Sequence, residues 1–334
     1  MTWFGAFRGT EVNQGSVAVA GVDIGGTNVK VALIDPISGR LVERQSFKTV
    51  AERGPEAVAQ DLADCLRELS RQAGAHGFRI AGVGVGCAGI IDSRKGLVLT
   101  SPNLPGWVRF PLGPRLATHL RLPVAVGNDV DCIGCGEYWL GAGRDLGDFL
   151  GIALGTGVGG CLIIGGKALT GAKGSAGEVG HMTIEPGGER CLCGNRGCLE
   201  TLASASWVVR RAKEQLRRGS PSRLDGAGDA LDAETIYRAA MDGDRLAGEL
   251  FAQVGRSLAI AIANVIHLLG IRGVLIGGGL AQAWDAFIGP LREEFARRLT
   301  MAPLAEVRIV RAELGDDAGT LGAAYLASYE LDLL

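Results

Sequence analysis

The stretch "SVAVAGVDIGGTNVKVALID", Ser16 to Asp35, decides the fold. Two runs rich in β-branched residues flank the turn "DIGGTN", so the stretch predicts a strand, a tight turn and a second strand in a hairpin. The stretch "FLGIALGTGVGGCLIIGG", Phe149 to Gly166, repeats this order of strand, Gly-rich turn and strand. Two related halves indicate a two-lobed α/β protein with a cleft between its lobes.

The composition is that of a water-soluble globular protein. The chain has 334 residues, a length for which about two domains are expected, and a net charge of -2. That charge gives no reason to expect nucleic-acid or membrane partners. The N-terminus has no secretory pattern, and the apolar run from Leu258 to Leu280 predicts a buried helix, a turn and a buried strand. We therefore expect a cytoplasmic protein whose eight cysteines are reduced or metal-bound.

The 53 glycines gather in clusters, among them "DIGGT", "GVGVGCAG", "GTGVGG" and "GGGL". Such clusters bring the backbone close to a neighbour, commonly a phosphate. None of them is a P-loop or a dinucleotide fingerprint, and a plain hairpin turn remains the alternative for "DIGGTN" taken alone. Together the turns could cradle one nucleotide, with Asp23 holding Mg²⁺ through water. The turn in "VLIGGGLA", Val274 to Ala281, could let a nucleoside approach the backbone.

Four residues between His181 and Glu200 have the spacing of a metal site. His181, Cys191, Cys193 and Cys198 form the Cys₃His set of a closed, structural zinc site, against the alternative of four unrelated residues. Such a zinc would fix the loop and the flanking Glu178 and Glu200. The Gly-rich turns lie elsewhere in the sequence, so we expect nucleotide binding to depend less on this metal. "CIGC", Cys132 to Cys135, is interpreted as two reduced cysteines on one helix face.

The segment "GND" places Asn128 and Asp129 at the start of an expected helix. Phosphoryl transfer requires a base for the attacking hydroxyl, and Asp129 is a candidate. A helix N-cap is the alternative role for this aspartate. Asp131 is the weaker candidate for the base.

The order of motifs resembles that of ROK-family sugar kinases, which have the actin-like ATPase and hexokinase (ribonuclease H-like) fold. The resemblance extends from about Val17 to Leu326 and includes "GVDIGGT", "GVGVGCAGIID", "SPNLPGW", "GNDVD", "LGTGVGG", "GEVGH", "CLCGNRGCLE", "IGGGLA" and "DDAGTLGAA". It implies a small lobe over residues 17–128, joined by a C-terminal helix over 318–332. It also implies a large lobe over 129–317 that carries the zinc loop.

The resemblance also implies roles for individual residues. Asp129 matches the general base. The sugar would be bound by Gly89, Asn103, Asn128, Asp129, Glu178, His181 and Glu200. ATP and Mg²⁺ would be bound by Asp23, Gly25, Gly26, Thr27, Asn28, Gly155, Thr156, Gly157, Gly277, Gly278 and Gly279. A structural Zn²⁺ and a homodimer are implied in the same way.

The expected reaction is phosphorylation of glucose to glucose 6-phosphate. The chain departs from the usual family pattern at Asn28, Ala88, Gly127 and the pair Val130–Asp131. Kinases for N-acetylmannosamine, N-acetylglucosamine or fructose therefore remain alternatives, and polyphosphate remains an alternative donor. A ROK repressor is a further alternative, although few residues precede Asp23 here to form the DNA-binding domain that such repressors carry.

Overall fold

The computed structural model describes residues 16–226 and 228–334. It divides into two compact units. Of the described residues, unit 1 comprises 16–145, 163–176 and 314–334, and unit 2 comprises 146–162, 177–226 and 228–313. The expected lobe boundary at residue 128 falls inside unit 1, because α3 (Asp129–Leu140) packs against α9 (Ala318–Glu330) of the same unit. The functional division into lobes stays a prediction.

Unit 1 is built on a five-stranded sheet with the order β3-β2-β1-β4-β8. The pairs β1–β2 and β2–β3 are antiparallel, and β1–β4 and β4–β8 are parallel. The expected hairpin at Ser16–Asp35 is therefore confirmed. The strands are β1 (Ser16–Ile24), β2 (Asn28–Ile34), β3 (Leu41–Lys48), β4 (Phe78–Cys87) and β8 (Val124–Asn128). A second, antiparallel sheet contains β5 (Ile90–Asp92), β6 (Leu97–Thr100) and β7 (Val108–Phe110).

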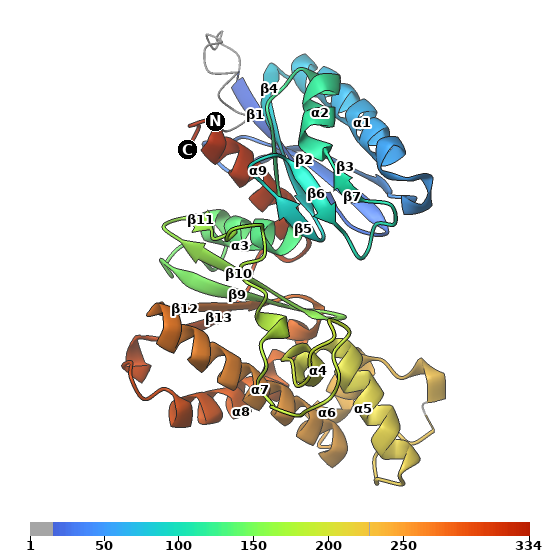
Figure 1. Cartoon of the computed structure of the whole chain (residues 1–334), viewed down its shortest axis with the longest axis vertical. Coiled ribbons are helices and arrows are strands. Elements are labelled where there is room, and N and C mark those ends of the chain that lie inside the picture. Colours follow the sequence, from blue (N-terminus) through green and yellow to red (C-terminus); the bar gives the residue numbers. More distant parts are fainter. Residues whose placement is uncertain (1–15, 227) are drawn as a thin grey trace. The chain divides into compact units, whose positions relative to one another are not determined.

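Helices cover both faces of the unit 1 sheet, with α1 (Pro55–Ala75) and α2 (Leu112–Leu120) on one face and α9 on the other (Figure 1). The α1 face is a packed apolar core. Pro55 begins α1 at a position where its missing N–H has no cost, and Leu62, Leu66 and Leu69 lie on its buried stripe. Val31 and Leu33 of β2 pack into the same core.

On the α9 face of this sheet, glycines let the helix backbone come close, beside an apolar cluster that includes Val19 and Ile34. On β1, Gly21 faces α9, and a Cβ there would lie 1.9 Å from the Thr320 carbonyl oxygen. On β4, a Cβ at Gly84 would lie 1.7 Å from the Ala323 oxygen. The cluster "GVGVG" is thus a strand whose glycines admit a helix, which corrects the expectation that a phosphate approaches it. Its valines, Val83 and Val85, point to the α1 core.

Unit 2 contains most of the second five-stranded sheet, whose order is β11-β10-β9-β12-β13. Strand β12 pairs in parallel with β9 and with β13. The expected repeat of strand, Gly-rich turn and strand is confirmed as β9 and β10. The strands are β9 (Phe149–Leu154), β10 (Val158–Ile164), β11 (Lys167–Ala168), β12 (Gly273–Gly277) and β13 (Arg308–Arg311); residues 163–176, at the β10–β11 end, belong to unit 1. The helices are α4 (Glu200–Ala203), α5 (Ala205–Arg217), α6 (Ala233–Met241), α7 (Arg245–Leu269) and α8 (Trp284–Arg298).

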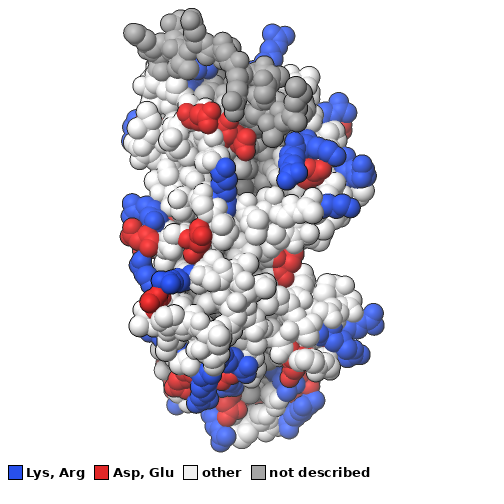
Figure 2. Space-filling model, turned by 60° about the vertical axis from the view of Figure 1, so that its left-hand side comes forward, with Lys and Arg blue, Asp and Glu red and all other residues white. Residues whose placement is uncertain are grey.

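Helix α7 is the core helix of unit 2. Asp244 caps it by accepting a hydrogen bond from the Ala247 N–H at 2.9 Å, and Gly270, with φ 68°, ends it. By length and apolar composition it could cross a membrane, yet 56% of its most apolar window is buried inside the protein. The expected buried helix, turn and strand after Leu258 are confirmed as α7 and β12. At the surface, both signs of charge are interspersed over the described part of the face in Figure 2.

The close packing of α9 predicts that Gly84 cannot be replaced. Gly84→Ala would place a methyl group on the Ala323 carbonyl oxygen, so we expect a loss of roughly 1–3 kcal/mol or more in unfolding free energy. The matched control is Gly248→Ala in α7, where a Cβ would meet nothing within 4 Å. That control should be stabilising by up to about 1 kcal/mol, because Ala forms helix better than Gly. Thermal unfolding followed by circular dichroism compares the two variants, and equal melting temperatures would contradict the packing argument.

Candidate active site

Two aspartates lie close enough to interact at one end of the unit 1 sheet. Asp23 lies near the carboxyl end of β1, and Asp129 is the first residue of α3, directly after β8. Burial raises the pKa of Asp23, and the negative charge of Asp129 raises it further, while Lys30 opposes the change. Burial also raises the pKa of Asp129, against hydrogen bonds that lower it. A half-buried carboxylate with a raised pKa has the character of a proton acceptor.

Asn128, and not Asp129, caps helix α3. The Asn128 Oδ1 accepts hydrogen bonds from the N–H groups of Val130 at 2.8 Å and Asp131 at 3.1 Å. The alternative prediction that Asp129 is the N-cap is therefore wrong, and its carboxylate does not cap the helix. The Asn128 Nδ2 donates to the Gly89 carbonyl oxygen at 3.0 Å, so most of the amide is used inside the protein. The Asn128 side chain also forms a hydrogen bond with the Asp129 carboxylate, which lowers the pKa of Asp129 against the effect of burial.

The first Gly-rich turn is fixed by a residue that the sequence analysis did not identify. The Thr49 hydroxyl donates to the Gly25 carbonyl oxygen at 2.7 Å, and the Thr49 N–H donates to the Thr27 oxygen at 3.0 Å. Thr49 is fully buried, whereas Thr27 and Asn28 are exposed. Nothing in the sequence marks Thr49 for this role, because its partners lie more than 20 positions earlier in the chain. The turn is thus held from behind, with its outer side open to a ligand.

Two other candidate residues of unit 1 lie beside these elements. A Cβ on Gly26 would lie 3.2 Å from the Asn103 carbonyl oxygen and 3.5 Å from the Asn103 Cβ, so the turn and Asn103 adjoin. Gly89 has a φ of 123°, and a Cβ there would lie 2.2 Å from the Thr100 oxygen. Only glycine fits this position. The structure therefore brings together the candidate residues of unit 1 that the sequence places far apart.

The turns of unit 2 meet at the carboxyl ends of the parallel strands β9 and β12. Gly155 donates its N–H to the Gly157 oxygen at 2.9 Å, which closes the turn after β9. Gly278, with a φ of 87°, follows β12, and a Cβ there would lie 2.4 Å from the Leu154 oxygen. The candidate residues at 155–157 and 277–279 are thus neighbours. Carboxyl ends of parallel strands are where open α/β sheets bind their ligands.

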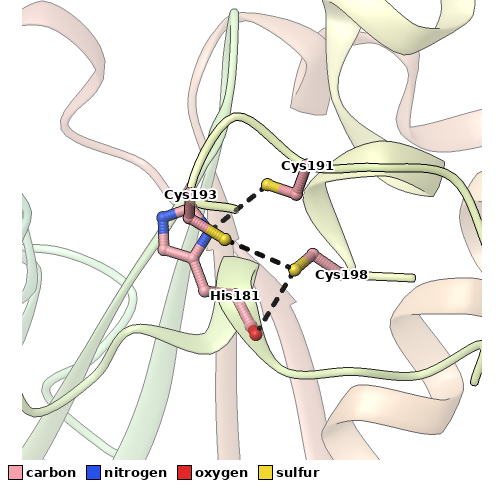
Figure 3. A group of neighbouring side chains, drawn as sticks. All are labelled: His181, Cys191, Cys193 and Cys198. Carbon is pink, nitrogen blue, oxygen red and sulfur yellow. Dashed lines mark hydrogen bonds between the residues drawn. The ribbon is translucent and has the colours of Figure 1, made fainter. Parts of the chain in front are cut away.

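The four expected metal ligands converge in unit 2 (Figure 3). Their ligand atoms all lie within 4.8 Å of one another. The Cys193 and Cys198 sulfurs are 3.7 Å apart, and the Cys191 sulfur is 3.8 Å from the His181 Nδ1. A tetrahedron around Zn²⁺ with Zn–S bonds of 2.3 Å has edges of about 3.8 Å. The donor set and its spacing therefore fit a tetrahedral ion.

A tight loop presents the cysteines of the cluster. Its base is closed by isolated bridges between Thr183 and Cys198 and between Arg190 and Arg196. The tip is a turn in which the Gly194 N–H donates to the Cys191 oxygen at 3.0 Å, and Gly194 has a φ of 95°. Cys191 and Cys198 are buried, while Cys193 is exposed.

The ring of His181 has a neighbour at each nitrogen. Nδ1 faces the thiols, while Nε2 lies 4.0 Å from the Glu178 Oε2. A ligand at Nδ1 would thus leave Nε2 to face a polar partner.

Glu200 connects the metal cluster to the turn after β9. Its Oε2 accepts a hydrogen bond from the Val158 N–H at 3.0 Å, and its Oε1 lies 3.7 Å from the Cys191 sulfur. A Cβ on Gly157 would lie 2.3 Å from the Glu200 Oε2, so a side chain at this position would displace the carboxylate. The cluster and the turn after β9, which lie apart in the sequence, are thus linked in the structure. One carboxylate touches both.

The sequence pattern of the ROK family matches residues 19–330. The chain belongs to the ROK family. It is 37% identical over 307 residues to a glucokinase from Thermotoga maritima, with 91% of this chain and 95% of the relative covered. It is 35% identical over 317 residues to an N-acetylmannosamine kinase from Shigella flexneri, with 94% and 99% covered.

Solved structures of the ROK family have the same fold. A ROK family glucokinase from Streptomyces griseus, in complex with glucose and AMPPNP, superimposes with a TM-score of 0.75 at 32% identity and covers 93% of this chain and 99% of its own. A ROK hexokinase from Thermus thermophilus gives a TM-score of 0.80 at 32% identity, with 94% and 99% covered. The expected actin-like ATPase and hexokinase fold is thereby confirmed for this ROK protein.

The raised pKa of Asp129 predicts the pH dependence of sugar phosphorylation by this ROK protein. If Asp129 acts as the base, kcat should fall on the acid side as its carboxylate takes up a proton. Because burial raises this pKa, the midpoint of the acid limb should lie above the ordinary aspartate value of about 3.9. A pH–rate profile at saturating sugar and nucleotide measures it, with circular dichroism at each pH as a control for folding. A midpoint at or below the ordinary value would contradict the assignment.

Proposed function

We propose that this ROK protein is an ATP-dependent hexokinase that converts glucose to glucose 6-phosphate. The observation that carries the proposal is the half-buried pair Asp23 and Asp129, because a base and a metal-binding carboxylate are what phosphoryl transfer to a hydroxyl requires. The similarity to the Thermotoga maritima glucokinase and the fold shared with the Streptomyces griseus glucokinase support glucose as the acceptor and ATP as the donor.

In this mechanism Asp129 accepts the proton of the attacking sugar hydroxyl. The hydroxyl oxygen forms a bond to the γ-phosphorus of ATP, the bond from that phosphorus to the bridging oxygen breaks, and ADP leaves. The raised pKa of Asp129 makes the carboxylate a stronger acceptor than an ordinary aspartate. Its place at the first turn of α3, with Asn128 as the cap, fixes the direction of the carboxylate.

The nucleotide is assigned to the Gly-rich turns. Asp23 would bind Mg²⁺ through water, and the metal, when bound, neutralises charge on the transferring phosphate. Backbone N–H groups of the exposed residues Gly26, Thr27 and Asn28 would contact phosphates in unit 1. In unit 2, the backbone N–H groups of Gly155, Thr156 and Gly157 would contact phosphates. The turn of Gly277, Gly278 and Gly279 would contact the nucleoside. Gly25 holds the first turn closed through its N–H to the Asn28 oxygen at 3.0 Å.

The sugar is assigned to the polar groups that the family resemblance implies. Asn103, Gly89 and Asn128 of unit 1 would contact it. Glu178, the Nε2 of His181 and Glu200 would contribute from unit 2. Carboxylates and amides suit an uncharged hexose, because each of its hydroxyls both donates and accepts.

We further propose a structural Zn²⁺ held by His181, Cys191, Cys193 and Cys198. Four protein ligands close the coordination sphere, so the ion would order the loop and would not bind a reacting water. Burial, followed by the neighbouring thiols, raises the pKa of Cys198 to about 12. Ion binding would therefore displace its proton and stabilise the loop between Glu178 and Glu200.

The substrate assignment is tested with a panel of sugars. We expect sugar-dependent ADP release with Mg²⁺ and ATP that is highest for glucose. N-Acetylmannosamine is the main competitor, because a kinase for that sugar is 35% identical to this chain. N-Acetylglucosamine, fructose and polyphosphate as donor complete the panel. Preference for an N-acetylated sugar would reject glucose, whereas sugar binding without ADP release would favour a sugar-responsive repressor.

The role of Asp129 predicts the kinetics of Asp129→Asn. The change preserves shape and removes the base, so kcat should fall by roughly 10²–10⁴. Sugar affinity should change much less, because an amide still forms hydrogen bonds with hydroxyls. Asp131→Asn, two residues further along α3, is the matched control and should retain most of kcat. Near-normal kcat in Asp129→Asn would show that Asp129 is not the base.

The metal assignment predicts the properties of Cys193→Ser. The variant should lose zinc, measured by elemental analysis, and should melt at a lower temperature. Because Glu200 touches both the cluster and the Val158 N–H, the affinities for sugar and for nucleotide should both fall. Cys65→Ser is the control, since Cys65 lies in unit 1 outside the cluster. Active enzyme without zinc, or unchanged sugar affinity in Cys193→Ser, would refute the link.

A cytoplasmic location and a homodimer are proposed from the family resemblance. The thiols support a reducing compartment, because all eight cysteines lie among the described residues and are free of disulfides. The net charge of -2 and the mixed signs of charge in Figure 2 give no support to a nucleic-acid or anionic membrane partner. Light scattering on the purified protein measures the oligomeric state.

A further inference from the structure

A charged side chain that the proposed mechanism does not use lies fully buried near the far end of α3. Glu137 has no exposed surface. Its Oε1 accepts a hydrogen bond from the Leu314 N–H at 2.8 Å, and its Oε2 accepts one from the Ala142 N–H at 2.9 Å. Burying a carboxylate is costly in free energy unless hydrogen-bond donors compensate it. Here the two donors are backbone N–H groups of segments that lie far from each other in the sequence.

The first segment is the turn that ends α3, and it is shaped around Glu137. The Gly141 and Gly143 N–H groups both donate to the Glu137 carbonyl oxygen, at 3.1 Å and 2.9 Å. A Cβ on Gly141 would lie 2.1 Å from the Glu137 Oε2. The glycines of "LGAG" therefore admit this one carboxylate, and the chain leaves unit 1 two residues after Gly143, at Asp145.

The second segment leads into α9. Leu314 is the residue at which the chain re-enters unit 1, and its carbonyl oxygen accepts the Asp317 N–H at 3.2 Å. Helix α9 begins at Ala318, and a Cβ on Gly319 would lie 3.0 Å from the Asp23 Oδ2. Glu137 thus holds a residue that lies only five positions before the contact with Asp23.

Helices α3 and α9 also touch directly through backbone atoms. A Cβ on Gly136 would lie 2.4 Å from the Ala318 oxygen, and a Cβ on Gly322 would lie 1.5 Å from the Cys132 oxygen. Backbone contact leaves no flexible side chain to absorb a shift, so movement at one helix is passed to the other. The helix that starts at Asp129 and the helix that adjoins Asp23 behave as one piece, and Glu137 fixes their junction.

We propose that Glu137 is a positioning residue for phosphoryl transfer, which fixes the placement of Asp129 relative to Asp23 by tying α3 to the segment that leads into α9. The inference rests on the proposed roles of Asp129 and Asp23. Glu137 makes no contact with substrate in this account. Its effect is geometric, because a small misplacement of reacting groups lowers the rate far more than it lowers binding.

The test compares Glu137→Gln and Glu137→Asp with wild type, by steady-state kinetics with glucose, ATP and Mg²⁺. Glutamine replaces one acceptor oxygen by an NH₂ group that faces a backbone N–H donor, and aspartate is too short to reach both donors. We expect kcat to fall by about 10- to 100-fold. The KM for glucose should change by less than about threefold, the pattern of an interaction that matters mainly in the transition state.

The matched control is Glu294→Gln on α8, a largely buried glutamate that pairs with Arg298 in unit 2. It should retain kcat. A double-mutant cycle with Asp23→Asn adds a readout that a purely structural role would not move. If Glu137 acts through the placement of the aspartates, its effect on kcat should be much smaller once Asp23 is replaced, so the two changes should not be additive.

Three outcomes would overturn the inference. They are an unchanged kcat in folded Glu137→Gln, additive effects in the cycle, and loss of the folded state in both Glu137 variants, which would assign the residue to stability alone. Asp129→Asn is measured in parallel. Full activity in that variant would reject Asp129 as the base, whereas an inactive Asp129→Asn beside a normal Glu137→Gln would reject only the positioning role.

Discussion

The arrangement of unit 1 depends on the contact of helix α9 with the backbone of its neighbours. Gly21 and Gly84 place the helix against the sheet, and Gly136 and Gly322 place it against α3. At each of these positions an added Cβ would lie within 2.5 Å of a carbonyl oxygen. The helix is therefore located by main-chain atoms, whose positions vary less than those of side chains. Asp23 and Asp129 stand on elements that this contact joins.

The sequence was sufficient for the features that depend on local patterns. The hairpin at Ser16–Asp35, its repeat after Phe149 and the helix that starts at Asp129 follow from turn chemistry and β-branched runs. The Cys₃His set was found by spacing alone, because ligand types and intervals reveal metal sites without knowledge of the fold.

Features that depend on partners distant in the chain were not predictable. The glycines of "GVGVG" signalled close approach, but only the fold shows that the neighbour is α9 and not a phosphate. The same holds for the buried Thr49 behind the first turn and for the hydrogen bond that Glu137 accepts from the Leu314 N–H. Glu200 was assigned to the sugar from the family resemblance, whereas its hydrogen bond from the Val158 N–H joins residues 42 positions apart. Long-range contacts of this kind leave no periodic signal in one sequence.

One cysteine of the cluster in Figure 3 is accessible to solvent, because Cys193 is exposed while Cys191 and Cys198 are buried. Ligand exchange at a metal begins with the donor that water and competing ligands can reach. The speed at which an ion enters or leaves would thus be governed at Cys193, whereas the strength of its binding is shared by all four donors. In the proposed zinc site, kinetic lability and thermodynamic affinity would in this way be set by different parts of one small loop.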